Sequence, residues 1–259
     1  MVNICILITG SGTIMNAILS AWSQGKIKNA EPKIIISSSK ENASALETVS
    51  KRYGIRTEII EYDGSKINDD CIPDNSISKD WITQWKSNPD IQDKLNSRWQ
   101  NYDKKIFELM LDSGVTPEDG LICLAEYRLL VSNELARLYK DRIMNIHPSL
   151  LPSFPGWRDV LENTLKYGVK ISGVSVHLVN DVLDSGSIIA QIPVPVFDGD
   201  DTASLRQRLL EEACKLYPYC INLFTINQIQ RKKGLLQGSM WKETLRTDDN
   251  LWSYADLLI

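Results

Sequence analysis

The chain has 259 residues, with 29 Lys and Arg against 33 Asp and Glu, which leaves a formal net charge of −4. A mildly acidic chain without a block of basic residues lacks the positive surface that binding to a nucleic-acid backbone requires. No apolar run approaches the roughly 18 residues of a membrane span, and no basic segment precedes the first apolar run as in a signal peptide. We therefore expect a cytoplasmic protein with no nucleic-acid or membrane partner.

The five cysteines and two histidines argue against disulfides and against a metal site. The cysteines are odd in number, scattered, and never arranged as CxxC. This usage is typical of a reducing compartment rather than of a disulfide framework. The two histidines, His147 and His177, and the cysteines lack the spacing of zinc ligands, so we expect no metal.

The first 60 residues alternate between strands and helices. Short apolar runs at 3–9, 33–36 and 56–60 predict strands. One helix is expected after Gly10-Ser11-Gly12-Thr13, and a second over residues 43–53. Strand–helix–strand alternation of this kind predicts an α/β fold of Rossmann type, in which a mostly parallel sheet carries helices on both faces.

Regular periodicity is lost after this region and returns near Asn88. Residues 62–87 are rich in polar residues, Gly and Pro, which predicts a surface insertion that could act as a lid. From Asn88 to Gly114, apolar side chains recur at spacings of three and four, as in a helix whose aromatic stripe packs on the core. We therefore interpret residues 62–105 as an insertion that contains a helix.

The second half of the chain continues the α/β pattern. Its expected elements are strands at 120–125 and 142–146, a helix at 134–139, extended segments at 169–179 and 187–196, and a long helix at 202–230. The tail from Lys232 carries Trp241 and Trp252 among polar residues, and we expect it to dock on the body. We expect residues 1–231 to form one domain and residues 232–259 to be a C-terminal appendage.

Asn145 and His147 are the strongest candidates for chemistry. They lie two residues apart at the end of a predicted strand, so their side chains point to the same side, and Pro148 ends the strand. Parallel α/β sheets bind ligands at this carboxyl edge. An amide can stabilise an oxyanion, and an imidazole can exchange a proton near neutral pH. The alternative is a histidine that satisfies backbone groups at a proline-rich turn.

The run NIHPSLLPSFPG at 145–156, followed by GVSVHLVNDVLDSGSIIAQIPVPV at 173–196, resembles the formyltransferases that use 10-formyltetrahydrofolate. The branch that formylates glycinamide ribonucleotide (GAR) in purine biosynthesis is nearest. The resemblance is strong over 119–226, fainter over 2–60, and absent over 62–105 and beyond 232. It implies direct transfer of a formyl group to a primary amine, and it implies a formyltransferase fold.

The resemblance also assigns roles to individual residues. It implies that Asn145, His147 and Asp184 are catalytic, that His177 supports them, and that the Leu151–Pro152 bond is cis. We expect the carboxylate of Asp184 to raise the pKa of His147. The implied folate-binding residues are Tyr127, Arg128, Leu129, Leu130, Val179 and Asp181. The implied acceptor or anion site is Gly10, Ser11, Gly12 and Thr13, at a helix N-terminus whose free N–H groups suit an anion.

Three departures from the family pattern leave the acceptor open. Ile14 stands in place of an asparagine after the glycine loop, Ala213 and Cys214 stand in place of a Glu–His pair, and Glu126 stands in place of a glycine. The acceptor is then a small, sometimes phosphorylated amine such as GAR, or an amino-sugar nucleotide. A tRNA acceptor and simple hydrolysis of the donor fit the motif less well. A non-catalytic folate-binding protein of the same fold is the alternative from another class, and the sequence also allows a homodimer.

Overall fold

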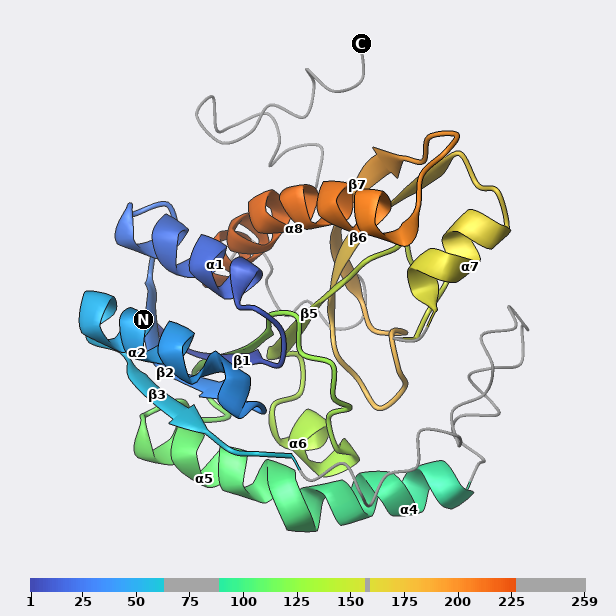
Figure 1. Ribbon diagram of the computed structural model, residues 1–259. Helices are drawn as coiled ribbons and strands as arrows, with labels where there is room; N and C mark the ends of the chain where they lie inside the picture. The colour runs from blue at the N-terminus through green and yellow to red at the C-terminus, as the bar shows by residue number, and fades with distance from the viewer. Residues whose placement is uncertain (63–88, 157–158, 227–259) are drawn as a thin grey trace.

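The computed structural model describes residues 1–62, 89–156 and 159–226, and these residues contain a seven-stranded sheet (Figure 1). The sheet order is β3-β2-β1-β4-β5-β6-β7. The strands are β1 (Val2–Ile8), β2 (Ala30–Ser37), β3 (Arg56–Ile59), β4 (Gly120–Leu124), β5 (Ile143–His147), β6 (Ile171–Leu178) and β7 (Ile188–Pro195). The pairings from β3 to β5 are parallel, whereas β6 is antiparallel to β5 and β7 is antiparallel to β6. The expected mostly parallel sheet is confirmed.

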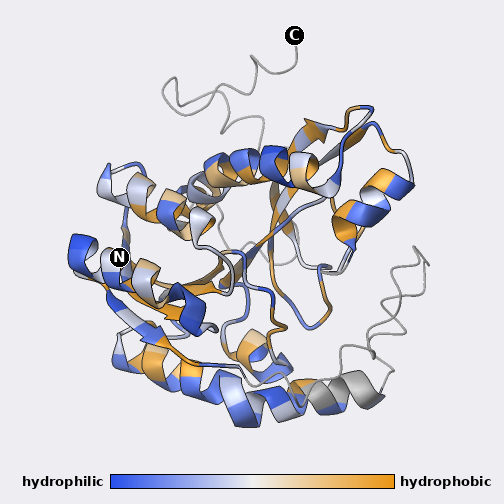
Figure 2. Ribbon diagram, in the orientation of Figure 1, coloured by the Kyte–Doolittle hydropathy of each residue, from blue (hydrophilic) through white to orange (hydrophobic). Residues whose placement is uncertain are grey.

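Helices cover both faces of the sheet because successive side chains of a buried strand point to opposite faces. In β1, Ile4, Ile6 and Ile8 pack into one core cluster, and Cys5 and Leu7 pack into the other. The first cluster includes side chains of α1 (Thr13–Ser23), α2 (Ala43–Tyr53), α7 (Val160–Lys166) and α8 (Thr202–Thr225). The second includes side chains of the π-helical turn η4 (Trp99–Asp103), α5 (Lys104–Asp112) and α6 (Asn133–Leu138). In Figure 2, hydrophobic residues concentrate on the strands and on the helix faces nearest the sheet.

Most expected elements lie within three residues of their predicted bounds. The β2 strand begins three residues earlier than expected and contains Pro32, which has no N–H to donate to the ladder. The pairing with β1 shifts register there, between Ile4 and Cys5. The short helix η1 (Lys40–Asn42) and α7 were not predicted. The lid expected at 62–87, apart from Tyr62, lies outside the described residues, as do residues 227–230 of the last helix and the tail with Trp241 and Trp252.

The helix expected to run without interruption from Asn88 is divided into three parts. It consists of α4 (Pro89–Arg98), η4 and α5. A π-helical turn places one extra residue in a helix, and such turns are often found at functional sites. Here the two charged residues that flank or end the turn, Arg98 and Asp103, are both buried.

Within the part of the chain that the structure describes, no helix is long and apolar enough to cross a membrane. The same residues contain no group of three or more His, Cys, Asp or Glu side chains placed to hold a metal ion. Four of the five cysteines lie in described segments, and all four are free thiols.

Candidate active site

A cavity of about 340 Å³ lies where the carboxyl ends of β1, β4 and β5 meet. The strand order reverses between β1 and β4: the chain adds β2 and β3 on one side of β1, and it then crosses back to add β4 and β5 on the other side of β1. Open α/β sheets bind ligands in the crevice at this reversal point. Gly10 follows β1, Glu126 follows β4, and Asn145 and His147 lie at the end of β5.

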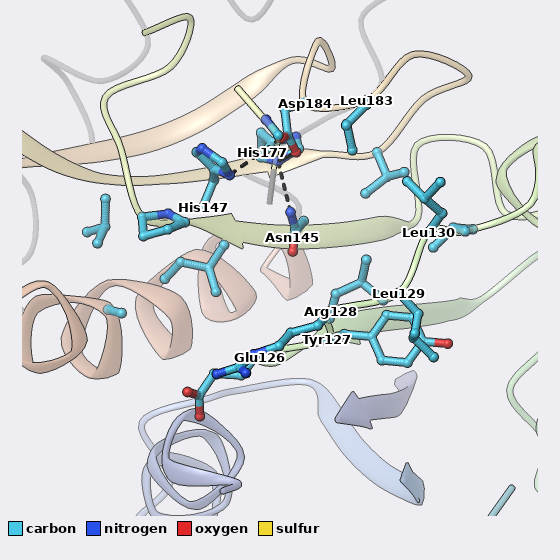
Figure 3. Close-up of a pocket in the computed structure, with 18 of the residues that line it drawn as sticks. Glu126, Tyr127, Arg128, Leu129, Leu130, Asn145, His147, His177, Leu183 and Asp184 are labelled. Carbon is cyan, nitrogen blue, oxygen red and sulfur yellow. Dashed lines mark hydrogen bonds and ion pairs between the residues drawn. The ribbon is translucent and has the colours of Figure 1, made fainter. Parts of the chain in front are cut away.

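The structure brings the four residues of the expected catalytic group together at this cavity (Figure 3). The antiparallel pairing of β5 with β6 places His177 directly opposite Asn145. Asp184 lies in the loop after β6, and its carboxylate reaches both rings: Oδ2 is 3.5 Å from His147 Nδ1, and Oδ1 is 3.5 Å from His177 Nε2. The N–H of Gly156 donates to Asp184 Oδ2 at 2.7 Å and holds the carboxylate in place.

Hydrogen bonds to backbone carbonyls determine which ring nitrogens carry protons. His147 Nε2 lies 2.8 Å from the carbonyl oxygen of Phe154, so this nitrogen donates. His177 Nδ1 donates to the carbonyl of Leu178 at 3.1 Å, which leaves His177 Nε2 as the acceptor for the amide of Asn145 at 3.2 Å. The Asn145 Nδ2 group has two hydrogens, and the second remains available to a ligand.

The expectation that Asp184 raises the pKa of His147 is wrong in its net outcome. Burial of the ring, which is 4% exposed, lowers the pKa below its usual 6.5, and the attraction of Asp184 and the bond to Phe154 offset this only in part. The pKa of Asp184 is lowered despite burial, because His147 and His177 attract the carboxylate when their rings are protonated and the N–H of Gly156 donates to it. In the free protein the arrangement is therefore a neutral imidazole beside a carboxylate.

The six residues expected to bind folate all line the same cavity, and Figure 3 labels four of them. Tyr127, Arg128, Leu129 and Leu130 come from the loop between β4 and α6, and Val179 and Asp181 come from the loop after β6. The wall is largely apolar, with a few polar groups, which is typical of a site for an organic ligand with an aromatic ring system. Their contact with folate stays a prediction.

A buried ion pair that we did not predict supports this wall from behind. The Arg98 guanidinium donates to the hydroxyl of Tyr127 at 2.8 Å and lies 3.0 Å from the carboxylate of Asp103. The other oxygen of Asp103 accepts the N–H of Ser132 at 2.7 Å. A signal was present in the sequence: Arg98 falls three residues after Leu95, inside the apolar stripe of the expected helix.

The glycine loop expected to bind the acceptor lies at the edge of the cavity and does not line it. None of Gly10, Ser11, Gly12 and Thr13 is a lining residue, whereas Ile14, the next residue, is one. Gly12, with φ of 78°, forms the N-cap of α1, and the hydroxyls of Ser11 and Thr13 bond to each other at 2.9 Å. Glu126 lines the cavity and lies directly against Gly10.

Comparison with known proteins identifies the class to which this fold and site belong. The sequence profile of the formyl transferase family matches residues 2–221. The chain therefore belongs to the formyl transferase family, and it is a folate-dependent formyltransferase enzyme.

Particular relatives are similar over most of the chain. It is 30% identical to the phosphoribosylglycinamide formyltransferase of Escherichia coli strain K12 over 231 residues, which cover 88% of this chain and 89% of that protein. The solved structure of glycinamide ribonucleotide transformylase 1 from Symbiobacterium toebii is similar with a TM-score of 0.67 and 32% identity, over 88% of this chain and 89% of the other. A trifunctional purine biosynthetic protein of Gallus gallus is 27% identical over 88% of this chain and 19% of its own length.

Proposed function

We propose that this enzyme transfers the formyl group of 10-formyltetrahydrofolate to the primary amine of a small acceptor, with Asn145, His147 and Asp184 as the catalytic residues. The observation that carries the proposal is the convergence of these three side chains on one cavity with an apolar wall. The relatives' names make glycinamide ribonucleotide the first acceptor to test.

The reaction requires stabilisation of an oxyanion and transfer of a proton. The amine nitrogen attacks the formyl carbon, and the carbonyl electrons move onto the formyl oxygen. The second hydrogen of Asn145 Nδ2, which is not used by His177, donates to this oxygen. Collapse of the tetrahedral species restores the carbonyl and breaks the bond between the formyl carbon and the folate nitrogen, which takes up a proton as it leaves.

The pair formed by His147 and Asp184 receives the proton that the amine loses. His147 Nε2 already donates to Phe154, whereas Nδ1 faces the carboxylate at 3.5 Å without a proton between them. A proton placed on Nδ1 completes this second contact. Negative charge on the nearby formyl oxygen raises the pKa of the ring, so the imidazole becomes protonated when the oxyanion forms. His177 acts through Asn145 and Asp184 and is a positioning residue.

The cavity divides the two substrates between its two sides. We assign the folate to the wall of Tyr127, Arg128, Leu129, Leu130, Val179 and Asp181, because four of these six residues offer apolar or aromatic side chains to an organic ring system. The acceptor enters from the side of Ile14 and the glycine loop Gly10, Ser11, Gly12 and Thr13. The formyl carbon then lies between the two substrates, beside Asn145.

The test is release of tetrahydrofolate by the purified chain in the presence of a panel of amines, including glycinamide ribonucleotide and an amino-sugar nucleotide. We expect His147→Ala and Asp184→Asn to lower kcat/KM about 100-fold or more. Asp198→Asn, which removes an exposed carboxylate paired with Lys170, is the matched control and should be neutral. Unchanged rates in the first two variants would show that the catalytic assignment is wrong. Release of tetrahydrofolate without any amine would indicate hydrolysis of the donor. Folate binding without turnover would indicate a non-catalytic protein.

A further inference from the structure

Glu126 combines two unfavourable features at one position in the cavity wall. Its φ of 57° lies in the left-handed region, where a residue with a Cβ is strained. Its Oε2 atom is buried and has no hydrogen-bond partner among the described residues. Both features destabilise the free protein, and strain of this kind persists mainly at binding and catalytic sites. Together, the strained backbone and the unpartnered oxygen indicate that the carboxylate of Glu126 binds a ligand.

The carboxylate lies between the cavity and the glycine loop. A methyl group added to Gly10 would be 3.3 Å from Glu126 Cβ and 3.5 Å from Oε1. Figure 3 shows the side chain directed away from His147 and Asp184, toward the start of α1. The N-cap of that helix is Gly12, which has no side chain to cap it. None of the ion pairs found among the described residues includes Glu126.

The groups around this carboxylate are mostly apolar. Ile14, Leu209 and Ala213 line the same cavity from α1 and α8 and offer no charge. The lining also contains the exposed residues Arg128 and Arg206, and neither forms an ion pair with Glu126 among the described residues. The carboxylate that lies against the start of the glycine loop is that of Glu126.

We propose that Glu126 selects the acceptor of the formyl transfer proposed above, and this inference rests on that proposed function. The carboxylate binds a hydrogen-bond-donating group of the acceptor, a hydroxyl or an ammonium, and it disfavours a phosphate dianion at the glycine loop. A carboxylate accepts from such donors and forms strong charge-assisted bonds with them. It repels a second anion at short range, so phosphate cannot use the N–H groups at the start of α1 without meeting this charge. The acceptor is then neutral or cationic where it meets Glu126.

The kinetic test compares glycinamide riboside with glycinamide ribonucleotide, two amines that differ by one phosphate. We expect wild-type kcat/KM to favour the riboside by about tenfold or more, and Glu126→Gln to lower that preference by about tenfold, since Gln keeps the shape and removes the charge. Glu162→Gln, which removes an exposed charge on α7, is the control and should leave the preference unchanged. Wild-type preference for the ribonucleotide, or a preference that Glu126→Gln does not alter, overturns the proposal.

A second measurement does not depend on catalysis. Inorganic phosphate is titrated into wild type, Glu126→Gln and Glu162→Gln and followed by NMR, with thermal unfolding as the check on folding. We expect phosphate to bind Glu126→Gln at least about tenfold more tightly than the other two. Equal affinity, or no measurable binding to Glu126→Gln, overturns the proposal. Absence of formyl transfer with every amine would refute the proposed function and leave this result standing by itself.

Comparison of glycinamide riboside with one further acceptor, 1,3-diaminopropane, distinguishes the hydroxyl from the ammonium. Glycinamide riboside offers hydroxyls, and 1,3-diaminopropane offers a second ammonium. The acceptor whose kcat/KM falls about tenfold or more in Glu126→Gln identifies the group that the carboxylate binds. If neither value falls, Glu126 does not bind the acceptor and this part of the proposal is wrong.

Discussion

Arg98 and Asp103 form the ion pair that joins the π-helical turn to the wall of the cavity, and each side chain is only 1% exposed. We expect Arg98→Met to lower the free energy of unfolding by about 3–5 kcal/mol. Met keeps much of the apolar stem of Arg98, but Asp103 is left buried without a counter-charge, which accounts for a loss of this size. The hydroxyl of Tyr127 also loses its donor, and the ring of Tyr102 loses a cation 4.7 Å from its centroid.

The geometry of this pair also predicts how the loss can be recovered. The charges are 3.0 Å apart, yet Asp103 Oδ1 and Arg98 Nε have no hydrogen-bond partner, so much of the desolvation of both ions is not offset. In Arg98→Met/Asp103→Asn, the asparagine oxygen can still accept the N–H of Ser132 while no charge is buried. We therefore expect the double variant to be about 2 kcal/mol more stable than Arg98→Met alone.

Urea unfolding of wild type, the two single variants and the double variant gives the coupling energy between the positions. Arg52→Met is the control, because Arg52 is exposed and stacks on Tyr53 at 5.1 Å, and it should cost less than about 0.5 kcal/mol. A loss below about 1 kcal/mol in Arg98→Met would show that the buried charge of Asp103 is solvated or neutralised in another way. A double variant as unstable as the sum of the singles would refute the coupling.

Three further predictions follow from the site and the sheet. Burial holds the pKa of His147 below 6.5, so just below that pH the unfolded chain binds more protons than the folded chain. Urea unfolding should therefore show a free energy of unfolding that falls as the pH drops below 6.5, by up to about 1.4 kcal/mol per pH unit. His147→Gln should remove this slope, and an unchanged slope would assign it to other groups. Gly173→Ala should lower stability by about 3 kcal/mol or prevent folding, because the added methyl would clash with the carbonyl oxygen of Ile192; a wild-type thermal transition would contradict this packing. Glu126→Gly should raise the free energy of unfolding by about 1 kcal/mol, since glycine adopts the φ of 57° without strain; a loss of stability in urea would refute the strain.

The local pattern of the sequence predicted most of the fold because it depends on periodicity and on residue type. Apolar runs separated by helical patterns indicated strands, helices and a mostly parallel sheet, and each expected strand in the described segments is present. The antiparallel direction of β6 and β7 was not predicted, because strand direction depends on how the chain returns to the sheet. The π-helical turn was missed as well, and with it the burial of Arg98 against Asp103, two residues whose charges indicate a surface position.

The sequence by itself determined which residue types could carry the chemistry and where they lie along the chain. Asn145 and His147 project from one strand end because side chains in a strand alternate, and the resemblance pointed to Asp184. Only the tertiary structure decided the direction in which the pKa of His147 shifts. Burial depends on everything that packs around the ring, and here its effect outweighs the attraction of the Asp184 carboxylate for a protonated His147. Tertiary structure likewise decided that Glu126 meets Gly10, a contact across 116 positions of sequence. Such a contact depends on the pairing of β1 with β4, which places two distant loops at one edge of the sheet.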